Sequence, residues 1–259
     1  MTAPTAHPDL LAEAVELACS AGDLTLRWFG GEDLQLQTKA DDTPVTIADR
    51  EAERLIRSEL ARRYPHDGII GEEEGVREGA SGRRWVVDPI DGTYGFVHGV
   101  PLYATLLAVL DDHGPLVGVI HLPALGETVY AARGLGCFWR RGGQPPRPAR
   151  VNAHRTLAGS AVMTSGVGHW RPGRLDRLHE ARAKVRTWGD GYGYALVATG
   201  RVEAMVDPEV SVWDLAPLPV ILAEAGGRFS TVDGRDDLWG GSGVASNGHI
   251  HDALLATLA

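Results

Sequence analysis

The start of the chain contains two stretches whose apolar positions recur at helical spacing. The first covers residues 8–29, and the second runs from residue 46 to about residue 63. This spacing predicts two amphipathic helices, each with one face against a core. Between them, residues 34–45 form an extended arm and a polar loop, and the loop at residues 39–44 is a candidate mobile element over a site.

Short apolar runs with β-prone residues follow and predict strands. They lie at residues 68–70, 85–87, 102–110, 116–121, 128–132 and 137–140. Turn-forming segments separate the last four runs, so we expect them to form a meander in an antiparallel or mixed sheet. A short helical turn is expected at residues 93–98, and its N-terminal amides could bind a phosphate group.

The second half alternates strands with helices, which is typical of βαβα organisation. A segment rich in Pro, Gly and Arg at residues 142–150 marks the boundary. We therefore predict a single domain, 1–259, with an N-terminal lobe at 1–145 and a C-terminal lobe at 146–259. Strands are expected at residues 160–164, 185–188, 201–207, 228–232 and 243–246, and helices at 174–183, 190–199, 211–225 and 249–258. Pro219 should bend or shorten the helix that contains it.

The stretch WVVDPIDGT at residues 85–93 places two carboxylates after a predicted buried strand. We expect Asp88 to end the strand, because Pro89 cannot continue a ladder, and Asp91-Gly92 to form a turn. Two close carboxylates repel each other unless a cation lies between them. Mg²⁺ is commonly held by one or two carboxylates together with substrate phosphate. The alternative is a surface turn in which Asp91 serves only turn formation.

Two further aspartates have both a structural and a functional interpretation. Thr46 and Asp49 have the spacing of a helix capping box, and so do Ser211 and Asp214. In that role each aspartate caps a helix and interacts favourably with its dipole. Capping and a role in a site do not exclude each other.

The run of three glutamates at residues 72–74 also has two interpretations. Such a run is typical of a solvated acidic loop. This one, however, directly follows a predicted strand and precedes another strand that ends in acids. Two strands of one sheet could therefore bring Glu72 and Asp88 together.

Composition and charge narrow the class of protein. The net charge of −9 over 259 residues argues against a nucleic-acid-binding surface, which would show a basic stripe. The two cysteines, Cys19 and Cys137, form no zinc pattern, so a reduced cytoplasmic protein is the simpler interpretation. The N-terminus does not resemble a signal peptide, and the longest apolar run is too short to span a bilayer.

Four motifs together resemble those of the inositol monophosphatase-like family, the Mg²⁺-dependent, lithium-sensitive phosphatases. They are TPVTIAD at residues 43–49, GEEEG at 71–75, VVDPIDGT at 86–93 and SVWDLAPLPVILAEAGG at 211–227. Their order and spacing agree with the family over nearly the whole chain. Within the family, the second half looks most like histidinol-phosphatases of the actinobacterial type, through WGDGYGYALVATGRVEAMVDPEVSVWDLA and GGSGVASNGHIHD.

The resemblance implies a fold, a cofactor and an assembly. The fold would be an α/β (α+β) structure, a layered αβαβα sandwich. The cofactor would be two to three Mg²⁺ ions, with Mn²⁺ as an alternative ion. The protein would be a cytoplasmic homodimer that acts on a small phosphorylated substrate and binds neither nucleic acid nor membrane.

The resemblance also implies a role for individual residues. The first metal would be held by Glu72, Asp88 and the carbonyl of Ile90, and the second by Asp88, Asp91 and Asp214, while a third, weaker ion would lie near Glu72. The attacking water would be oriented and deprotonated by Thr93 and Asp49, with help from Glu73. The phosphate would meet the backbone amides of Gly92 and Thr93. Asp190 and Asp207 would face the rest of the substrate.

These roles imply a phosphomonoesterase, with histidinol phosphate as the leading substrate. A carboxylate at Asp190 would suit its cationic amine, although Asp190 could instead only cap a helix. The alternatives are an inositol-1-phosphate or related polyol, sugar or nucleotide phosphatase and, in another class, a catalytically idle homologue that binds a phosphate ligand. The chain departs from many relatives at Tyr94 and Asp207, which weakens the substrate assignment, and at Gly95, which lacks the side-chain contact that those relatives make within the motif loop.

Overall fold

The computed structural model describes residues 3–31, 34, 36–38 and 44–259 of the chain. Its first half contains the helices α1 (Pro8–Thr25), α2 (Ile47–Arg63) and α3 (Thr93–Val97). Strands β1 (Gln37–Thr38) and β2 (Pro44–Val45) pair with each other. The other strands of this half are β3 (Gly68–Gly71), β4 (Gly75–Arg77), β5 (Arg84–Asp91), β6 (Ala104–Asp111), β7 (Gly114–Leu122), β8 (Glu127–Ala132), β9 (Gly136–Arg141) and β10 (Arg147–Pro148).

These eight strands form one sheet in the order β10-β9-β8-β7-β6-β5-β3-β4. Strands β5 to β9 are antiparallel neighbours, which confirms the predicted meander, whereas β3 and β5 run parallel. A short 3₁₀ turn at Pro123–Leu125 joins β7 to β8. Most of the predicted loop over the site, residues 39–43, lies outside the described residues.

The second half forms a five-stranded sheet and five helices. The strands are β11 (Ala161–Met163), β12 (Lys184–Arg186), β13 (Ala204–Asp207), β14 (Arg228–Ser230) and β15 (Gly243–Ser246), in the order β12-β11-β13-β15-β14. The helices are α4 (Arg174–Glu180), α5 (Asp190–Ala198), α6 (Val212–Leu215), α7 (Leu218–Ala225) and α8 (His251–Leu258).

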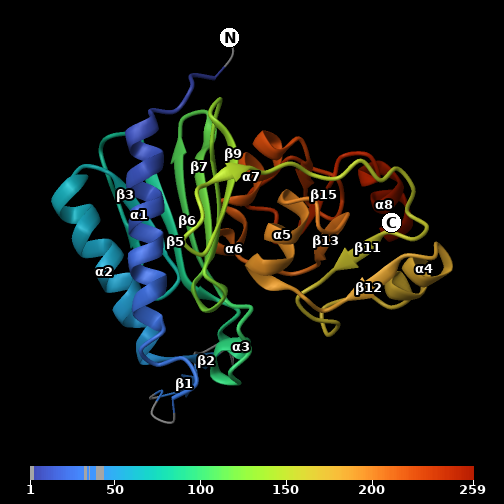
Figure 1. The fold of residues 1–259 in the computed structure, drawn as a ribbon, viewed down its shortest axis with the longest axis horizontal. Coiled ribbons are helices and arrows are strands. Elements are labelled where there is room, and N and C mark those ends of the chain that lie inside the picture. Colours follow the sequence, from blue (N-terminus) through green and yellow to red (C-terminus); the bar gives the residue numbers. More distant parts are fainter. Residues whose placement is uncertain (1–2, 32–33, 35, 39–43) are drawn as a thin grey trace.

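Helices and sheets alternate in layers across the molecule (Figure 1). Helices α1 and α2 cover the outer face of the first sheet, and α5, α6 and α7 lie between the two sheets. Helices α4 and α8 pack together beyond the second sheet. This arrangement is the predicted αβαβα sandwich. The division into lobes at residue 145 stays a prediction. In the described part of the chain, no helix is long and apolar enough to cross a bilayer.

Three local predictions were wrong in detail. The first helix ends at Thr25 rather than at residue 29. Strand β5 continues beyond Asp88 to Asp91, because a change of register there accommodates Pro89. The predicted helix at 211–225 is divided at Ala216–Pro217 into α6 and α7. The strand pairing of the second sheet was not predicted; the sheet is mixed, since β15 is antiparallel to both β13 and β14.

A buried histidine in the second half gives a prediction about acid stability. His251 is fully buried, and its two ring nitrogens lie 2.9 Å from the hydroxyls of Ser230 and Ser246. Burial, with a smaller effect of Arg228, lowers its pKa to about 4. The unfolded chain therefore takes up a proton near pH 6.5, whereas the folded protein resists protonation until about pH 4.

The contribution of His251 should thus be complete above pH 6.5 and be lost as the pH falls towards 4, by about 3 kcal/mol in the free energy of unfolding. Urea unfolding of the wild type and of His251→Gln at pH 7.5 and pH 4.5 measures this. The stability difference between the two proteins should shrink at the lower pH, since Gln binds no proton. A difference that stays constant would contradict the assignment.

Candidate active site

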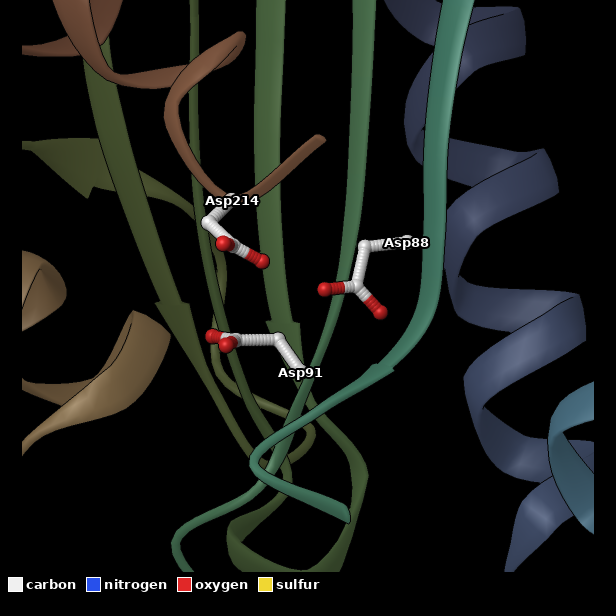
Figure 2. A group of neighbouring side chains, drawn as sticks. All are labelled: Asp88, Asp91 and Asp214. Atoms are coloured by element: carbon white, nitrogen blue, oxygen red, sulfur yellow. The ribbon is translucent and has the colours of Figure 1, made fainter. Parts of the chain in front are cut away.

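Three carboxylates form a compact cluster at the inner face of the first sheet. Asp88 and Asp91 come from the end of β5, and Asp214 comes from α6, which packs on that strand. The carboxylates point toward one another in Figure 2, and one oxygen of each lies within 4.8 Å of the others. The register change in β5 matters here, because it places two acids three residues apart on the same side of the strand.

Burial makes this cluster electrostatically unfavourable when all three groups are ionised. Burial raises the pKa of Asp88 well above its usual range, and the charges of Glu72, Asp91 and Asp214 raise it further. Burial, followed by the charges of Asp190 and Asp214, has the same effect on Asp91. Burial is also the main reason that the pKa of Asp214 rises to about 7. At neutral pH, the three carboxylates can therefore all stay ionised only when a cation lies beside them.

Both predicted capping boxes are present. Asp49 accepts hydrogen bonds from the amide and the hydroxyl of Thr46 at 2.8 and 2.6 Å, and Asp214 accepts one from the amide of Ser211 at 2.7 Å. Capping uses only Oδ2 of Asp49. Its Oδ1 lies 3.4 Å from the hydroxyl of Thr93, the first residue of α3.

Thr93 is held beside the metal motif by a second contact. Its hydroxyl donates to the carbonyl oxygen of Ile90 at 2.9 Å, and the amide of Ile90 donates to Oδ1 of Asp88 at 3.1 Å. Burial, opposed by the hydrogen bonds from Thr46, raises the pKa of Asp49 to about 6. A hydroxyl and a carboxylate therefore meet at one edge of the cluster, as a proton-accepting pair would require.

The acidic loop after β3 is fixed by a residue that the sequence did not point out. Glu53 is fully buried on α2 and accepts the amides of Glu73 and Glu74 at 2.8 and 3.0 Å. Arg57 donates to the same carboxylate at 2.7 Å. Gly71 is needed for this approach, since a Cβ there would lie 2.1 Å from Oε1 of Glu53. In the sequence, this role of Glu53 was indicated only by its being an acidic residue one helical turn after Asp49.

This loop carries Glu72 to the cluster. The amide of Glu72 donates to the carbonyl of Val87 at 3.2 Å, across the parallel pair β3 and β5, and, in addition to burial, the charge of its carboxylate raises the pKa of Asp88. The expectation that two strands of one sheet bring Glu72 and Asp88 together is therefore correct. Glu53 acts indirectly, because it holds the loop that carries Glu72 in position.

Glu53→Gln should weaken metal binding more than turnover. The side-chain NH₂ group of Gln would face one of the N–H groups whose hydrogen bonds Glu53 now accepts. The loop bearing Glu72 would therefore shift. We expect the Mg²⁺ concentration for half-maximal activity to rise about 10- to 100-fold, and kcat at saturating Mg²⁺ to fall less. Glu59→Gln is the matched control, because Glu59 lies on the same helix and its ion pairs within the described residues are with Arg62 and Arg63. Equal Mg²⁺ requirements in both variants would contradict this role.

Two helix starts meet at Asp91. Gly92 precedes α3 with a φ of 86°, and a Cβ there would lie 2.7 Å from Oδ2 of Asp190. Asp190 begins α5, and the amide of the next residue, Gly191, donates to Oδ2 of Asp91. The structure therefore brings Asp190 beside the motif, where the family resemblance implies that it lies, and both glycines are required by this close packing.

Asp207 lines a cavity that Asp91 and Asp190 also line, and its carboxylate accepts two hydrogen bonds from other residues. Its oxygens accept the amide of Ser165 and the hydroxyl of Tyr194, both at 2.9 Å. Ser165 in turn accepts the amide of Asp190 at 2.8 Å. These contacts give Asp207 a role in holding the Asp190 segment. Its predicted contact with substrate stays a prediction.

A cavity of about 610 Å³ is lined by seven of the predicted site residues, namely Glu72, Asp91, Gly92, Thr93, Asp190, Asp207 and Asp214. The described residues that line it include no lysine or arginine, although six of them are acidic: Glu72, Asp91, Asp190, Asp207, Glu209 and Asp214. Such a cavity repels a phosphate group unless cations are bound. Several hard oxygen ligands at short mutual distances suit Mg²⁺, so the residues present fit a divalent metal.

Comparisons with known proteins agree with this geometry. Residues 8–259 match the model of the inositol monophosphatase family. The chain is 45% identical over 256 residues to a histidinol-phosphatase of Mycobacterium tuberculosis, covering 97% of this chain and 98% of that protein. It is 38% identical to an inositol-1-monophosphatase of Mesorhizobium japonicum, covering 96% of each. An IMPase structure from Thermotoga maritima superposes with a TM-score of 0.86 at 30% identity, covering 96% of both chains. The predicted family and the phosphoric monoester hydrolase activity are confirmed, and the chain belongs to the inositol monophosphatase family.

Proposed function

We propose that this protein hydrolyses histidinol phosphate to histidinol and phosphate with the help of bound Mg²⁺. The observation that carries the proposal is the acid-lined cavity, which combines a carboxylate cluster suited to metal with further carboxylates beyond it. The similarity to proteins named histidinol-phosphatase supports the same substrate. Each chemical role below is part of this proposal.

Metal would be held by the residues that the motifs indicate. One ion would use Glu72, Asp88 and the carbonyl of Ile90, a second would use Asp88, Asp91 and Asp214, and a third would lie near Glu72. Bound Mg²⁺ supplies positive charge for the phosphate, lowers the pKa of a bound water and stabilises the leaving oxygen. The start of α3 adds the backbone amides of Gly92 and Thr93, which would donate to the phosphate oxygens.

Thr93 and Asp49 would take the proton from the attacking water. The Thr93 hydroxyl lies 3.4 Å from Oδ1 of Asp49, so once its proton turns from the carbonyl of Ile90 to this carboxylate it can accept a hydrogen bond from water. Asp49 is buried beside the acidic loop and can hold the proton at Oδ1, because Oδ2 is used in capping. Glu73 would assist from the same loop.

The non-phosphate end of the substrate would be recognised by charge. Asp190 stands next to Gly92, and Glu209 lies on the same cavity wall in an ion pair of 2.8 Å with His169. Histidinol phosphate carries a protonated amine, whereas inositol phosphate offers only hydroxyls at that end. The exposed ring of Tyr94 at the cavity could also stack on an imidazole.

Phosphate release with Mg²⁺ from a panel of substrates tests the proposal. The panel contains L-histidinol phosphate, inositol 1-phosphate, fructose 1,6-bisphosphate and adenosine 3′,5′-bisphosphate, with Asp88→Asn as the blank. A strong preference for histidinol phosphate that Asp190→Asn reduces would support the substrate. A preference for inositol phosphate, or a flat profile, would leave a broader phosphatase, and no release from any of them would favour an idle phosphate-binding homologue.

Several finer expectations accompany the proposal. Mg²⁺ as the natural ion, Mn²⁺ as its replacement, inhibition by lithium and assembly as a homodimer are predicted from the family. A cytoplasmic location is predicted from the cysteine usage and the N-terminal sequence. All five stay predictions.

A further inference from the structure

A second group of reactive side chains lies on the opposite face of the first sheet, under α1. His121, Thr128 and Arg140 are successive partners across β7, β8 and β9, so their side chains lie in a row on one face. Cys19 and Asp23 are one turn apart on α1, which packs over this row. The fold therefore brings a thiol, an imidazole, a guanidinium and a carboxylate together.

The contacts within this group are close. Nη2 of Arg140 lies 3.1 Å from Sγ of Cys19, and Nδ1 of His121 lies 3.6 Å from the same sulfur. On the other side of the ring, Nε2 of His121 lies 3.1 Å from Oδ1 of Asp23. The ring reaches α1 because Gly22 makes room, since a Cβ there would lie 2.5 Å from Cδ2 of His121.

These neighbours favour the ionised thiol. Burial raises the pKa of Cys19, but the hydrogen bond and charge of His121, with Thr128 and Arg140, outweigh it, so the pKa lies below that of an ordinary cysteine. Burial lowers the pKa of His121, and its contacts with Cys19 and Asp23 raise it overall. Tyr130 also lies near the thiol, and burial raises its pKa, so it stays neutral.

The group is open to solvent on one side. A cavity of about 390 Å³ is lined by Asp23, His121, Thr128 and Arg140, and Cys19 itself is only partly buried. The other thiol, Cys137, is buried, and burial raises its pKa to about 12. The protein thus contains one partly exposed thiol beside Arg140 and His121 and a second thiol that is buried.

We propose that Cys19 is a peroxide-reactive thiolate, held ready by Arg140 and His121, while Cys137 stays reduced. The thiolate sulfur attacks one oxygen of hydrogen peroxide, an S–O bond forms and the O–O bond breaks. The sulfur loses two electrons and becomes a sulfenic acid, and the released hydroxide takes a proton from the His121 imidazolium to become water. No part of the phosphate cavity takes part in this reaction.

Sulfenic acid formation can be measured directly on the full chain. The reduced protein is treated with hydrogen peroxide in the presence of dimedone between pH 5 and pH 9, and labelling of each cysteine is followed by peptide mass spectrometry. We expect Cys19 to be labelled more than about tenfold faster than Cys137, with a half-maximal rate below the ordinary thiol pKa of about 8.5. Equal labelling of the two cysteines, or a midpoint at or above 8.5, would overturn the proposal.

Variants separate this electrostatic effect from simple exposure. Arg140→Gln removes the guanidinium and should lower the Cys19 rate at pH 7 about tenfold and raise the midpoint, because the thiolate fraction falls. Arg155→Gln, at an exposed position in the second half, has the same change in net charge and should leave the rate unchanged. Circular dichroism verifies that both variants are folded. If Arg140→Gln folds and reacts like the wild type, Arg140 does not activate the thiol, and the proposal fails. The pH profile of the wild type tests the proposal even without variants.

Discussion

Asp88→Asn is expected to lower kcat for phosphate release by at least about 1,000-fold. Asp88 is the residue common to both proposed metal sets, and it lies at the centre of the carboxylate cluster. Asn keeps its shape but offers one neutral oxygen, so both sets lose a charged ligand. The measurement is single-substrate kinetics at several Mg²⁺ concentrations, because a loss of affinity alone would be recovered at high Mg²⁺.

The same variant should not be less stable without metal. Burial and the charges of Glu72, Asp91 and Asp214 make an ionised Asp88 unfavourable in the metal-free protein. Asn removes one of these charges, so the metal-free Tm should be unchanged or a few degrees higher, whereas Mg²⁺ should raise the Tm of the wild type more than that of the variant. Asp112→Asn, at an exposed position on the β6–β7 turn, is the control. A variant that keeps more than a tenth of wild-type activity would contradict the central role of Asp88.

The cluster could be predicted from the sequence because its signals are local. The spacing of Asp88 and Asp91 around Pro89, next to a β-prone run, was sufficient to place two acids at one strand end. The path of the backbone there was not predictable. Whether Pro89 ends the strand or is absorbed in a register change depends on the pairing with β6, and that pairing is made by residues distant in sequence.

Glu53 shows why the support of a site is harder to predict than its ligands. A glutamate inside a helix is usually an exposed residue. This one is buried because the amides of the acidic loop and Arg57 reach it from two other directions. The same holds for Gly92 and Asp190, whose contact requires the starts of α3 and α5 to meet. Local sequence patterns predict a helix or a strand, whereas the residues that pack against it depend on the fold of the whole chain.

The second half illustrates a different limit. The alternation of strands and helices predicted the elements, and the family resemblance predicted the layered class. It did not predict that β15 lies between β13 and β14 in antiparallel pairing, because hydrophobic periodicity carries no information about strand order. Pro219 did indicate a disturbance of its helix. The observed result is a complete division, which leaves α6 as a short helix that carries Asp214 to the cluster.

Thr93→Val is expected to lower kcat by about 100- to 10,000-fold with little change in KM. Val has nearly the shape of Thr but no hydroxyl, so the link between the attacking water and Asp49 would be lost while the metal ligands stay in place. Thr93→Ser restores a hydroxyl at the same position and should recover most of the activity. A Thr93→Val variant within threefold of the wild type would show that the hydroxyl has no part in the reaction.

The double variant Thr93→Val/Asp49→Asn decides whether the two residues act together. If the hydroxyl passes its proton to Asp49, removing either group disables the same step, and the double variant should lose hardly more kcat than the worse single variant. Independent roles would instead multiply the two losses. Asp49 also caps α2, so its single variant should lose stability as well as activity, whereas Thr93→Val should lose mainly activity. The comparison of kcat with Tm across the three variants therefore separates the proton-accepting role of Asp49 from its role in the helix.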